Sequence, residues 1–373
     1  MSQPNAIFIA ATGQNVGKTT LCLGIIAALR NRFSSVGFIK PVGQRHVKID
    51  GQTNVDKDTV LFKEYFQLSA SWADMSPVII PSGFTRAYLD EETTEVQLLQ
   101  DIHRAFQTIS SQNAYTVVEG TGHVGVGSIV GLNNAKVAAE LGLDMVIIAS
   151  GGLGSAFDEL ALNVAMCRHY GVKVKGVILN RVLEKKRGMI QKYFPKTLLQ
   201  WGIPLIGCVP YSESLSSHTM QDFETLFDTT LLSGLTHHYR NFLHTRLVAG
   251  SLQAYEAEML SRQLVITPAS REDIILRMLQ EHRKRSMNNE DFGGGMILTG
   301  RQPPREEIME QIRSVDVPVL YAPMCSYDAM KMITSFTAKI RREDTPKIEK
   351  AIQLVEQNIN FDIFCLDDRK TKK

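Results

Sequence analysis

The sequence predicts an α/β protein in which a doubly wound parallel sheet is followed by a smaller three-layer α/β domain. Three observations support this fold class. Apolar strand-like runs alternate with helix-like segments over residues 6–210, the first run leads directly into a Gly-Lys-Thr loop, and the alternation lapses near residue 210 before it resumes. Strands that are buried on both faces are apolar along their whole length. The pattern therefore predicts a sheet covered by helices on both sides.

The first apolar strand, residues 6–12, ends in a glycine-containing turn that precedes a helix. The unpaired backbone N–H groups and the positive dipole end of such a helix attract a polyphosphate. Lys18 is expected to reach the outer phosphates, and the Thr19 hydroxyl is placed to hold a magnesium ion. We therefore predict a phosphate-binding loop (P-loop), although Thr12 stands where the consensus has its first glycine. Its nucleotide-contacting residues are predicted to be Gly13, Gln14, Asn15, Val16, Gly17, Lys18, Thr19 and Thr20.

The remaining elements of the first domain are predicted from their periodicity. The strand at 36–40 is stopped by Pro41, and the helix at 95–110 carries apolar residues at helical spacing. Helices are expected at 18–33, 58–66, 95–110, 133–141, 156–170 and 187–201, and strands at 36–40, 115–118, 145–149, 174–179 and 205–209.

The alternation then lapses in a stretch with serines, a weakly helical segment and the adjacent His237 and His238. Adjacent histidines on a helix point to different faces, so a surface connector is favoured over a metal site. The predicted domains are therefore 1–215 and 246–373, with a connector at 216–245.

In the second domain the α/β rhythm resumes without another P-loop. Ser270 and Asp273 form a predicted capping box, and Thr345 followed by Pro346 predicts another helix start. Helices are expected at 252–260, 271–284, 305–313, 327–340 and 346–357, and strands at 264–267, 296–299 and 318–321.

Length and composition limit the function classes. A chain of 373 residues is long enough for two separate cores, and 44% hydrophobic with 21% charged residues is ordinary for a soluble globular protein. The net charge of +2 gives no overall electrostatic footprint for nucleic acid. The five cysteines are far apart and are interpreted as reduced core residues, and we expect neither a leader nor a membrane-spanning run. We therefore expect a cytoplasmic protein that binds no nucleic acid and no membrane.

Charged residues follow the second strand, at the edge where the P-loop lies. Lys40 ends that strand, where it can neutralise a transferring phosphoryl group, hold a substrate carboxylate, or simply extend its ammonium to solvent. Asp56 and Asp58 lie at the start of a helix, so each can be an N-cap or a metal ligand. Asp58 is the favoured magnesium ligand, and the choice between the two aspartates stays open.

Glu119 ends the strand at 115–118 and is followed at once by Gly-Thr-Gly. A carboxylate at that strand end is expected to face the metal and the γ-phosphate, with glycines that let backbone N–H groups approach. The stretch 120–131 is interpreted as either a mobile loop over the phosphates or a surface turn. The predicted catalytic residues are Lys18, Lys40 and Glu119.

Two later strand ends complete the candidate nucleotide site. Asn180 can read an adenine ring because its amide offers both a donor and an acceptor, although asparagine is also a common turn former. Pro210 and Tyr211 end the last strand, where a ring can pack against the base. In the second domain, the glycines at 293–295 and the Gly-Arg pair at 300–301 form either an anion site or ordinary turns.

Taken together, these motifs resemble the dethiobiotin synthetase family over roughly residues 6–211. The resemblance implies ATP and Mg²⁺ as cofactors, with Lys18 and Lys40 at the phosphates and Asn180 at the adenine. It also implies Thr19, Asp58 and Glu119 as the metal ligands. The matching positions are Gly17-Lys18-Thr19, Lys40-Pro41-Val42, Asp58, Val117-Val118-Glu119-Gly120 and Asn180.

Other stretches are similar to the amino-terminal, non-catalytic half of long phosphate acetyltransferases, in which this type of P-loop NTPase domain precedes a DRTGG domain. They are Glu119-Gly120-Thr121, Asn134-Ala135 and the run at 138–142. The second domain resembles the DRTGG type at 270–273 and 298–301, and it departs from that pattern at Ala269-Ser270 and Arg301. The resemblance implies a small-molecule ligand for the second domain and a homodimer or higher homo-oligomer.

Two functions compete. The first is a nucleotide-responsive regulatory or sensor protein that binds Mg-ATP and hydrolyses it slowly, and for this reading no acetyl-transferring domain is expected after residue 373. The second is an ATP-dependent ligase of the dethiobiotin synthetase type, in which a carboxylate or carbamate attacks the γ-phosphate before an internal amine closes the ring. No residues that fit a diamino fatty acid stand out, so the sequence favours the first function.

Overall fold

The computed structural model describes residues 5–337 and 339–365, which form two compact units. Among these residues, the first unit contains 5–212 and 340–365, and the second unit contains the rest. The predicted domains and the predicted helix at 327–340 also include residues 1–4, 338 and 366–373, which lie outside the described residues. In the described part of the chain, no helix combines the length and the hydropathy that a bilayer span requires.

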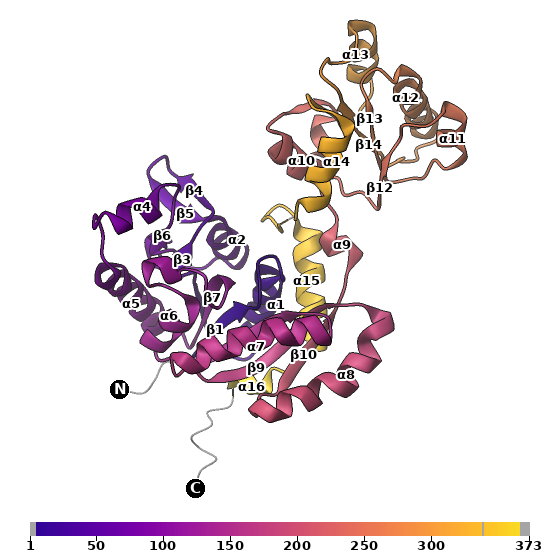
Figure 1. The fold of residues 1–373 in the computed structure, drawn as a ribbon. Helices are drawn as coiled ribbons and strands as arrows, with labels where there is room; N and C mark the ends of the chain where they lie inside the picture. Colours follow the sequence, from indigo (N-terminus) through magenta and orange to yellow (C-terminus); the bar gives the residue numbers. More distant parts are fainter. Residues whose placement is uncertain (1–4, 338, 366–373) are drawn as a thin grey trace. The chain divides into compact units, whose positions relative to one another are not determined.

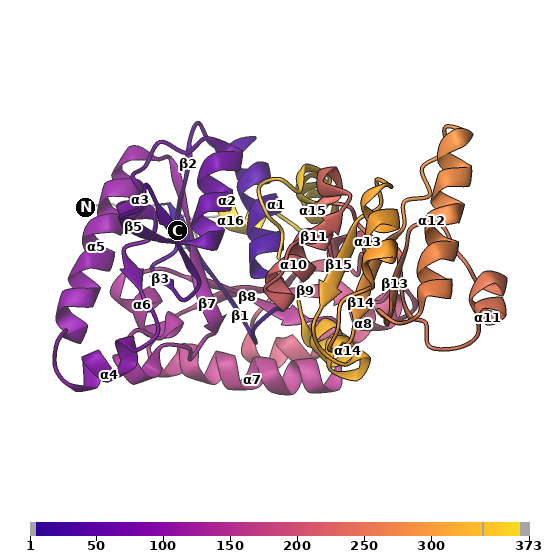
Figure 2. The same cartoon turned by 90° about the horizontal axis from the view of Figure 1, so that it is seen from above.

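A six-stranded parallel sheet forms the centre of the first unit (Figure 1). Its strands are largely buried because helices cover both faces (Figure 2), which explains their continuous apolar runs. Because all the strands are parallel, their carboxyl ends lie along one edge of the sheet, where ligands bind in this class of fold. In order across the sheet, the strands are β10 (Leu205–Pro210), β9 (Val174–Val182), β8 (Met145–Ser150), β1 (Ala6–Ala11), β7 (Tyr115–His123) and β2 (Val36–Ile39).

The helices predicted for the first domain are present in the first unit, which also contains short helices that were not predicted and a helix at Thr345–Asn358, which was assigned to the second domain. α5 (Glu95–Gln112) begins at a capping box, in which Thr94 and Gln97 satisfy each other's backbone N–H groups. The others are α1 (Lys18–Arg30), α2 (Lys57–Phe66), α3 (Trp72–Met75), α4 (Phe84–Leu89), η1 (Ser128–Val130), α6 (Asn134–Glu140), α7 (Gly154–His169), α8 (Glu184–Leu198), η2 (Leu199–Trp201), α15 (Thr345–Asn358) and α16 (Asp362–Cys365).

Between β2 and α5 the chain forms short strands that the sequence analysis did not anticipate. β4 (His46–Ile49) and β5 (Thr53–Asp56) make an antiparallel hairpin, whose turn contains Asp50 and Gly51 at φ 53° and 70°. An Asp-Gly pair favours such a turn because both residues tolerate positive φ. β3 (Val42–Gly43) and β6 (Val78–Ile79) form a second small sheet, which is parallel. Because the hairpin ends directly before α2, it positions Asp56 and Asp58 at the start of that helix.

The second unit is built on a five-stranded sheet in the order β11-β15-β14-β13-β12, parallel except for β11. One apolar cluster includes Ile275 and Phe292, and another includes Phe223 and Phe242. The strands are β11 (Leu231–Ser233), β12 (His244–Leu247), β13 (Gln263–Pro268), β14 (Gly295–Thr299) and β15 (Val319–Ala322). The helices are α9 (Glu213–Ser216), α10 (Met220–Phe227), η3 (Leu235–His237), α11 (Leu252–Ala257), α12 (Glu272–Met287), α13 (Glu306–Arg313) and α14 (Ser326–Ser335).

The structure differs from the predicted domain boundaries at residues 216–245. This segment was expected to be a connector, but it contributes α10, β11 and β12 to the second unit. Met220 and Phe223 on α10 are fully buried in the core of that unit. The sequence showed only a weakly helical segment here, and the serines and histidines around it favoured a connector over a packed element.

The boundary also differs at the carboxyl-terminal side. Residues 340–365 were assigned to the second domain, but α15 packs against α1 of the first unit. The close approach depends on Gly24 of α1, because a Cβ atom there would lie only 2.2 Å from Cβ of Val355. The second unit is therefore an insertion between β10 and α15 of the first.

Two predicted helix starts are also shifted. The N-cap of α12 is Arg271 rather than Ser270, and no side chain caps this helix. The reason is that the Arg271 guanidinium pairs with both oxygens of Asp273, so the Ser270–Asp273 capping box does not form. At α15 the N-cap is Asp344, and Thr345 lies inside the helix.

Candidate functional site

The P-loop connects β1 to α1 at the carboxyl edge of the first sheet. Gly17 is the N-cap of α1 and has φ 102°. A Cβ atom at Gly17 would lie 2.2 Å from Nδ2 of Asn180, so glycine suits both the backbone conformation and the available space. Asn180 lies on β9 and donates a hydrogen bond from Nδ2 to the Val16 carbonyl oxygen at 2.8 Å. The predicted adenine reader therefore contacts the P-loop directly.

Lys18, the first residue of α1, reaches the neighbouring strand β7. Its Nζ donates hydrogen bonds to the carbonyl oxygens of Gly122 at 2.7 Å and Gly13 at 3.4 Å. Burial lowers the pKa of Lys18 to about 8, and the Glu119 carboxylate opposes this shift. A phosphate is a stronger partner for an ammonium than a neutral carbonyl, so this side chain can exchange its present partners for an anionic ligand.

Lys40 follows β2 and is buried among three carboxylates. Its Nζ lies 3.0 Å from Oδ1 of Asp56 and 3.5 Å from Oε1 of Glu119, and it forms a third ion pair with Oδ2 of Asp58. Burial alone would lower the pKa of Lys40, but the charges of Asp58, Glu119 and Asp56 outweigh it and raise the pKa. Lys40 therefore stays an ammonium. The predicted alternative of a lysine that extends into solvent is wrong, because only 5% of Lys40 is exposed.

The hairpin β4-β5 and helix α2 place the two aspartates. Asp56 ends β5 and is the N-cap of α2, where its Oδ1 accepts a hydrogen bond from the Asp58 backbone N–H at 2.9 Å. Its own backbone N–H donates to Oγ of Ser76 at 3.1 Å. Asp56 thus has the predicted capping role, while Asp58 in the first turn directs its carboxylate to Lys40. Both aspartates belong to the cluster around Lys40.

Thr19 and Glu119 face each other from α1 and β7. The Thr19 hydroxyl donates to Oε1 of Glu119 at 3.4 Å, and only 1% of Glu119 is exposed. A hydroxyl and buried carboxylates are the oxygen donors that Mg²⁺ prefers, so the chemistry of the donor set fits this ion. Within the described residues, however, no three His, Cys, Asp or Glu side chains are arranged to hold a metal. The carboxylates converge on Lys40 instead.

The segment after Glu119 is more regular than predicted. Residues 120–131 were interpreted as a loop or surface turn, but β7 continues to His123 before a turn leads into η1. Asn134 accounts for the extension of β7 beyond Glu119. Its Oδ1 accepts a hydrogen bond from the Thr121 backbone N–H at 3.0 Å, and its Nδ2 donates one to the Thr121 carbonyl oxygen at 2.7 Å. This amide supplies the partners that an extended strand end needs.

Asn163 is a second buried amide that the sequence analysis missed. Its Oδ1 accepts from the Val124 backbone N–H at 2.9 Å, and its Nδ2 donates to the Thr12 carbonyl at 3.4 Å. It therefore links the end of β1 to the turn after β7. The only signal in the sequence was a polar residue on the apolar face of a predicted helix, which alone does not reveal a partner.

The last predicted nucleotide contacts lie at the end of β10. Pro210 is the final residue of this strand, and the Tyr211 backbone N–H donates to the Val182 carbonyl at 2.9 Å. The Tyr211 side chain is 44% exposed. These residues lie at the same carboxyl edge as the P-loop, but β10 is the outermost strand on that side.

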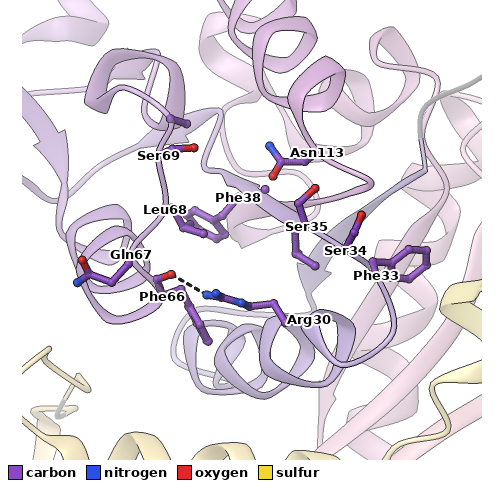
Figure 3. A pocket seen from close by; sticks show the side chains of 13 residues that line it. Arg30, Phe33, Ser34, Ser35, Phe38, Phe66, Gln67, Leu68, Ser69 and Asn113 are labelled. Atoms are coloured by element: carbon purple, nitrogen blue, oxygen red, sulfur yellow. Dashed lines mark hydrogen bonds between the residues drawn. The ribbon is translucent and has the colours of Figure 1, made fainter.

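A cavity of about 280 Å³ lies elsewhere in the first unit (Figure 3). It is lined by residues at the start of β2 and the end of α2, among them Ser35, Phe38 and Leu68. Arg30 closes one side, where its guanidinium donates to the Phe66 carbonyl at 2.6 Å. This is the amino edge of the sheet, so the cavity is separate from the P-loop site.

Two glycines among the candidate ligand features of the second unit make internal contacts. The Gly293 backbone N–H donates to Oδ1 of Asp291 at 2.8 Å in the turn that precedes β14. Gly300 has φ 129°, and its N–H donates to the Met324 carbonyl at 2.7 Å. Its own carbonyl accepts from the Tyr321 hydroxyl at 2.7 Å. These glycines therefore serve turns at both ends of β14.

Comparison with known proteins agrees with both parts of the predicted resemblance. Residues 5–219 match the family described as AAA domain, and residues 225–336 match the family described as DRTGG domain. Phosphate acetyltransferase of Pseudomonas aeruginosa is 25% identical over 378 residues, which cover 96% of this chain and 51% of that protein. ATP-dependent dethiobiotin synthetase of Bacillus velezensis is 25% identical over 242 residues, which cover 62% of this chain and 97% of that protein.

The chain spans about half the length of the phosphate acetyltransferases that it matches. Among solved structures, the cell division protein MinD of Aquifex aeolicus is 14% identical with a TM-score of 0.35, covering 56% of this chain and 84% of that one. The CBS and DRTGG domains of Clostridium perfringens pyrophosphatase, complexed with diadenosine tetraphosphate, are 12% identical with a TM-score of 0.26, covering 51% and 73%. These likenesses concern the general fold only.

Proposed function

The chain belongs to the family described as AAA domain, and from this membership and the geometry above we propose that its first unit binds Mg-ATP at the P-loop. One observation carries the proposal. Two lysines, a threonine hydroxyl and buried carboxylates from four separate segments meet at the carboxyl edge of the sheet. No apolar packing requirement explains such a cluster, whereas a polyphosphate with its cation needs both signs of charge.

Each residue has a role in this proposal. Lys18 and Lys40 contact the phosphates, and Asn180 with Pro210 lies beside the adenine. When bound, Mg²⁺ would supply charge neutralisation at the outer phosphates. Thr19, Asp58 and Glu119 would hold it, since they offer the oxygen donors that this ion requires.

Glu119→Gln tests the assignment of the metal ligand. We expect ATP affinity to remain within about threefold, or 0.7 kcal/mol, of the parent, because glutamine keeps the shape of the side chain. The dependence of binding on magnesium and any phosphate release should be largely lost, since the anionic ligand is gone. Titration calorimetry with and without magnesium, together with a phosphate-release assay, measures both effects.

The exposed Glu140→Gln on α6 is the matched control, because it removes the same charge away from the site. It should behave like the parent in both assays. Phosphate release by Glu119→Gln at the parental rate would mean that Glu119 is only a structural residue at the end of the strand.

We further propose that the protein is a nucleotide-responsive regulator that hydrolyses ATP slowly. The chain connectivity supports this role. The second unit is inserted between β10 and α15, and α15 packs on α1, the helix that begins at the P-loop. A change at the phosphates can therefore reach α15 through a packed helix pair, and coupling of two sites requires such a shared element.

Hydrogen exchange distinguishes this regulator from other P-loop proteins. We expect ATP to slow amide exchange in 120–131 and also to change it in the second unit, around Ser270 or in 293–301. Mass spectrometry of the full chain with and without Mg-ATP measures both regions. Protection confined to the first unit would argue against a regulatory role.

A second candidate function is an ATP-dependent ligase of the dethiobiotin synthetase type. The similarity to ATP-dependent dethiobiotin synthetase over 97% of that protein favours it. In this case Lys40 would stabilise the phosphoryl group during transfer to a carboxylate or carbamate. Diaminopelargonate with bicarbonate should then accelerate phosphate release well above the rate with ATP alone, while exchange in the second unit stays unchanged.

We also propose a small-molecule ligand for the second unit, a homodimer or higher homo-oligomer, and a cytoplasmic location. The first of these extends the resemblance to the DRTGG type, which residues 225–336 match. Mass spectrometry of molecules that copurify with the full chain would identify such a ligand, and light scattering would give the oligomeric state.

A further inference from the structure

Lys40 occupies the centre of the acidic cluster, where a bound cation would be expected. Its side chain is 6% exposed, and the side chains of Asp56, Asp58 and Glu119 are 2%, 6% and 1% exposed. An ammonium has three N–H donors and no acceptor, and here three carboxylates surround it. One positive and three negative groups give the cluster a formal charge of −2.

The ammonium of Lys40 and a metal ion would compete for two of these oxygens, Oδ2 of Asp58 and Oε1 of Glu119. Oε1 of Glu119 already lies within 3.5 Å of Nζ of Lys40 and 3.4 Å of the Thr19 hydroxyl. The other proposed metal ligand, Asp58, also pairs with Lys40. A magnesium ion needs short, nearly octahedral oxygen contacts, and its charge would repel an ammonium held against the same carboxylates. The two cations therefore oppose each other's binding at this cluster.

We propose that Lys40 is a built-in counter-cation, which holds the metal-binding carboxylates in the nucleotide-free protein and must leave them before a divalent cation binds. This inference rests on the proposed function for the identity of the metal ligands. It explains why three buried carboxylates converge on Lys40.

Because the metal ion replaces Lys40 at the carboxylates, metal binding depends on nucleotide binding. Once Lys40 leaves its carboxylates, it needs another anionic partner, because an unpaired buried ammonium is strongly unfavourable. Phosphate oxygens at the adjacent P-loop provide that partner. Without a nucleotide, Lys40 stays in place and magnesium alone binds weakly.

Thermal unfolding of the full chain without nucleotide tests the proposal. The variants are Lys40→Met, which keeps the length of the side chain without its charge, and the control Lys57→Met, which removes an exposed charge beside the aspartates. Magnesium chloride at about 10 mM should shift the Tm of the parent and of the control by less than about 1 °C. In Lys40→Met the Tm without magnesium should fall by about 5 °C or more, and magnesium should raise it by at least about 3 °C.

A second variant is available if Lys40→Met does not fold. Lys40→Met with Asp56→Asn removes one uncompensated carboxylate, and asparagine remains a good N-cap for α2. Asp58 and Glu119 are unchanged, so magnesium should again raise the Tm. Absence of a magnesium response in this double variant, or an equal response in the parent, would overturn the proposal. Because these measurements contain no nucleotide, a failure of the parent to bind ATP would be recognised separately by calorimetry.

Discussion

Lys18→Ala is expected to weaken Mg-ATP binding at least about tenfold, which corresponds to about 1.4 kcal/mol or more. In the structure, Nζ of Lys18 donates hydrogen bonds to the carbonyl oxygens of Gly122 and Gly13, at 2.7 Å and 3.4 Å. These neutral contacts are lost without leaving a buried charge. In the proposed complex, the hydrogen bonds from Lys18 to phosphate are charge-assisted. Their loss should therefore weaken ATP binding more than it lowers the stability of the fold.

Two further variants separate the charge from the packing of the Lys18 side chain. Lys18→Met keeps the aliphatic stem and should lose affinity as strongly as Lys18→Ala, because the ammonium carries the effect. The exposed Lys186→Ala on α8 should bind Mg-ATP like the parent. Titration calorimetry measures all three, and parental affinity in Lys18→Ala would refute the P-loop assignment.

Gly24→Ala should lower the free energy of unfolding by about 1–3 kcal/mol, although alanine is the better helix former. The reason is the contact between α1 and α15, where an added Cβ would lie 2.2 Å from Cβ of Val355. Two backbones that pack this closely cannot separate without loss of the surrounding apolar contacts. Chemical denaturation of the full chain measures the change.

Gly188→Ala is the matched control for this effect. Gly188 also lies inside a helix, α8, but a Cβ atom there would meet nothing within 4 Å. This substitution should therefore stabilise the protein by about 0.5–1 kcal/mol through helix propensity alone. If both substitutions stabilised the protein equally, the α1–α15 contact would be looser than the structure shows.

The sequence predicted the first sheet well, because its strands are apolar runs and the helices between them show apolar residues at helical spacing. The hairpin of β4 and β5 was missed because its strands are short and half exposed, with little apolar alternation. Helix α15 was recognised as a helix, but its amphipathic pattern does not say which unit it covers. Its packing on the first unit depends on the close approach of α15 to α1 at Gly24, which is visible only in the folded structure.

For the candidate site, sequence motifs located the residues but not their mutual contacts. Motif spacing placed Lys40, Asp58 and Glu119 at one edge of the sheet, and the structure brings them together. The convergence of the carboxylates on Lys40 was not predicted, because each of these residues was assigned a contact with phosphate or metal and none with another side chain. Asn134 and Asn163 were missed as partners of the backbone near the site, since buried amides leave no periodic signal.

The central claim is that the first unit binds one Mg-ATP at the P-loop. Titration calorimetry of the full chain with ATP in the presence of magnesium tests it most directly. We expect saturable binding of one ATP per chain, weaker binding when magnesium is removed, and a loss of at least about tenfold in affinity with Lys18→Ala. The absence of saturable binding to the folded parent protein would contradict the claim.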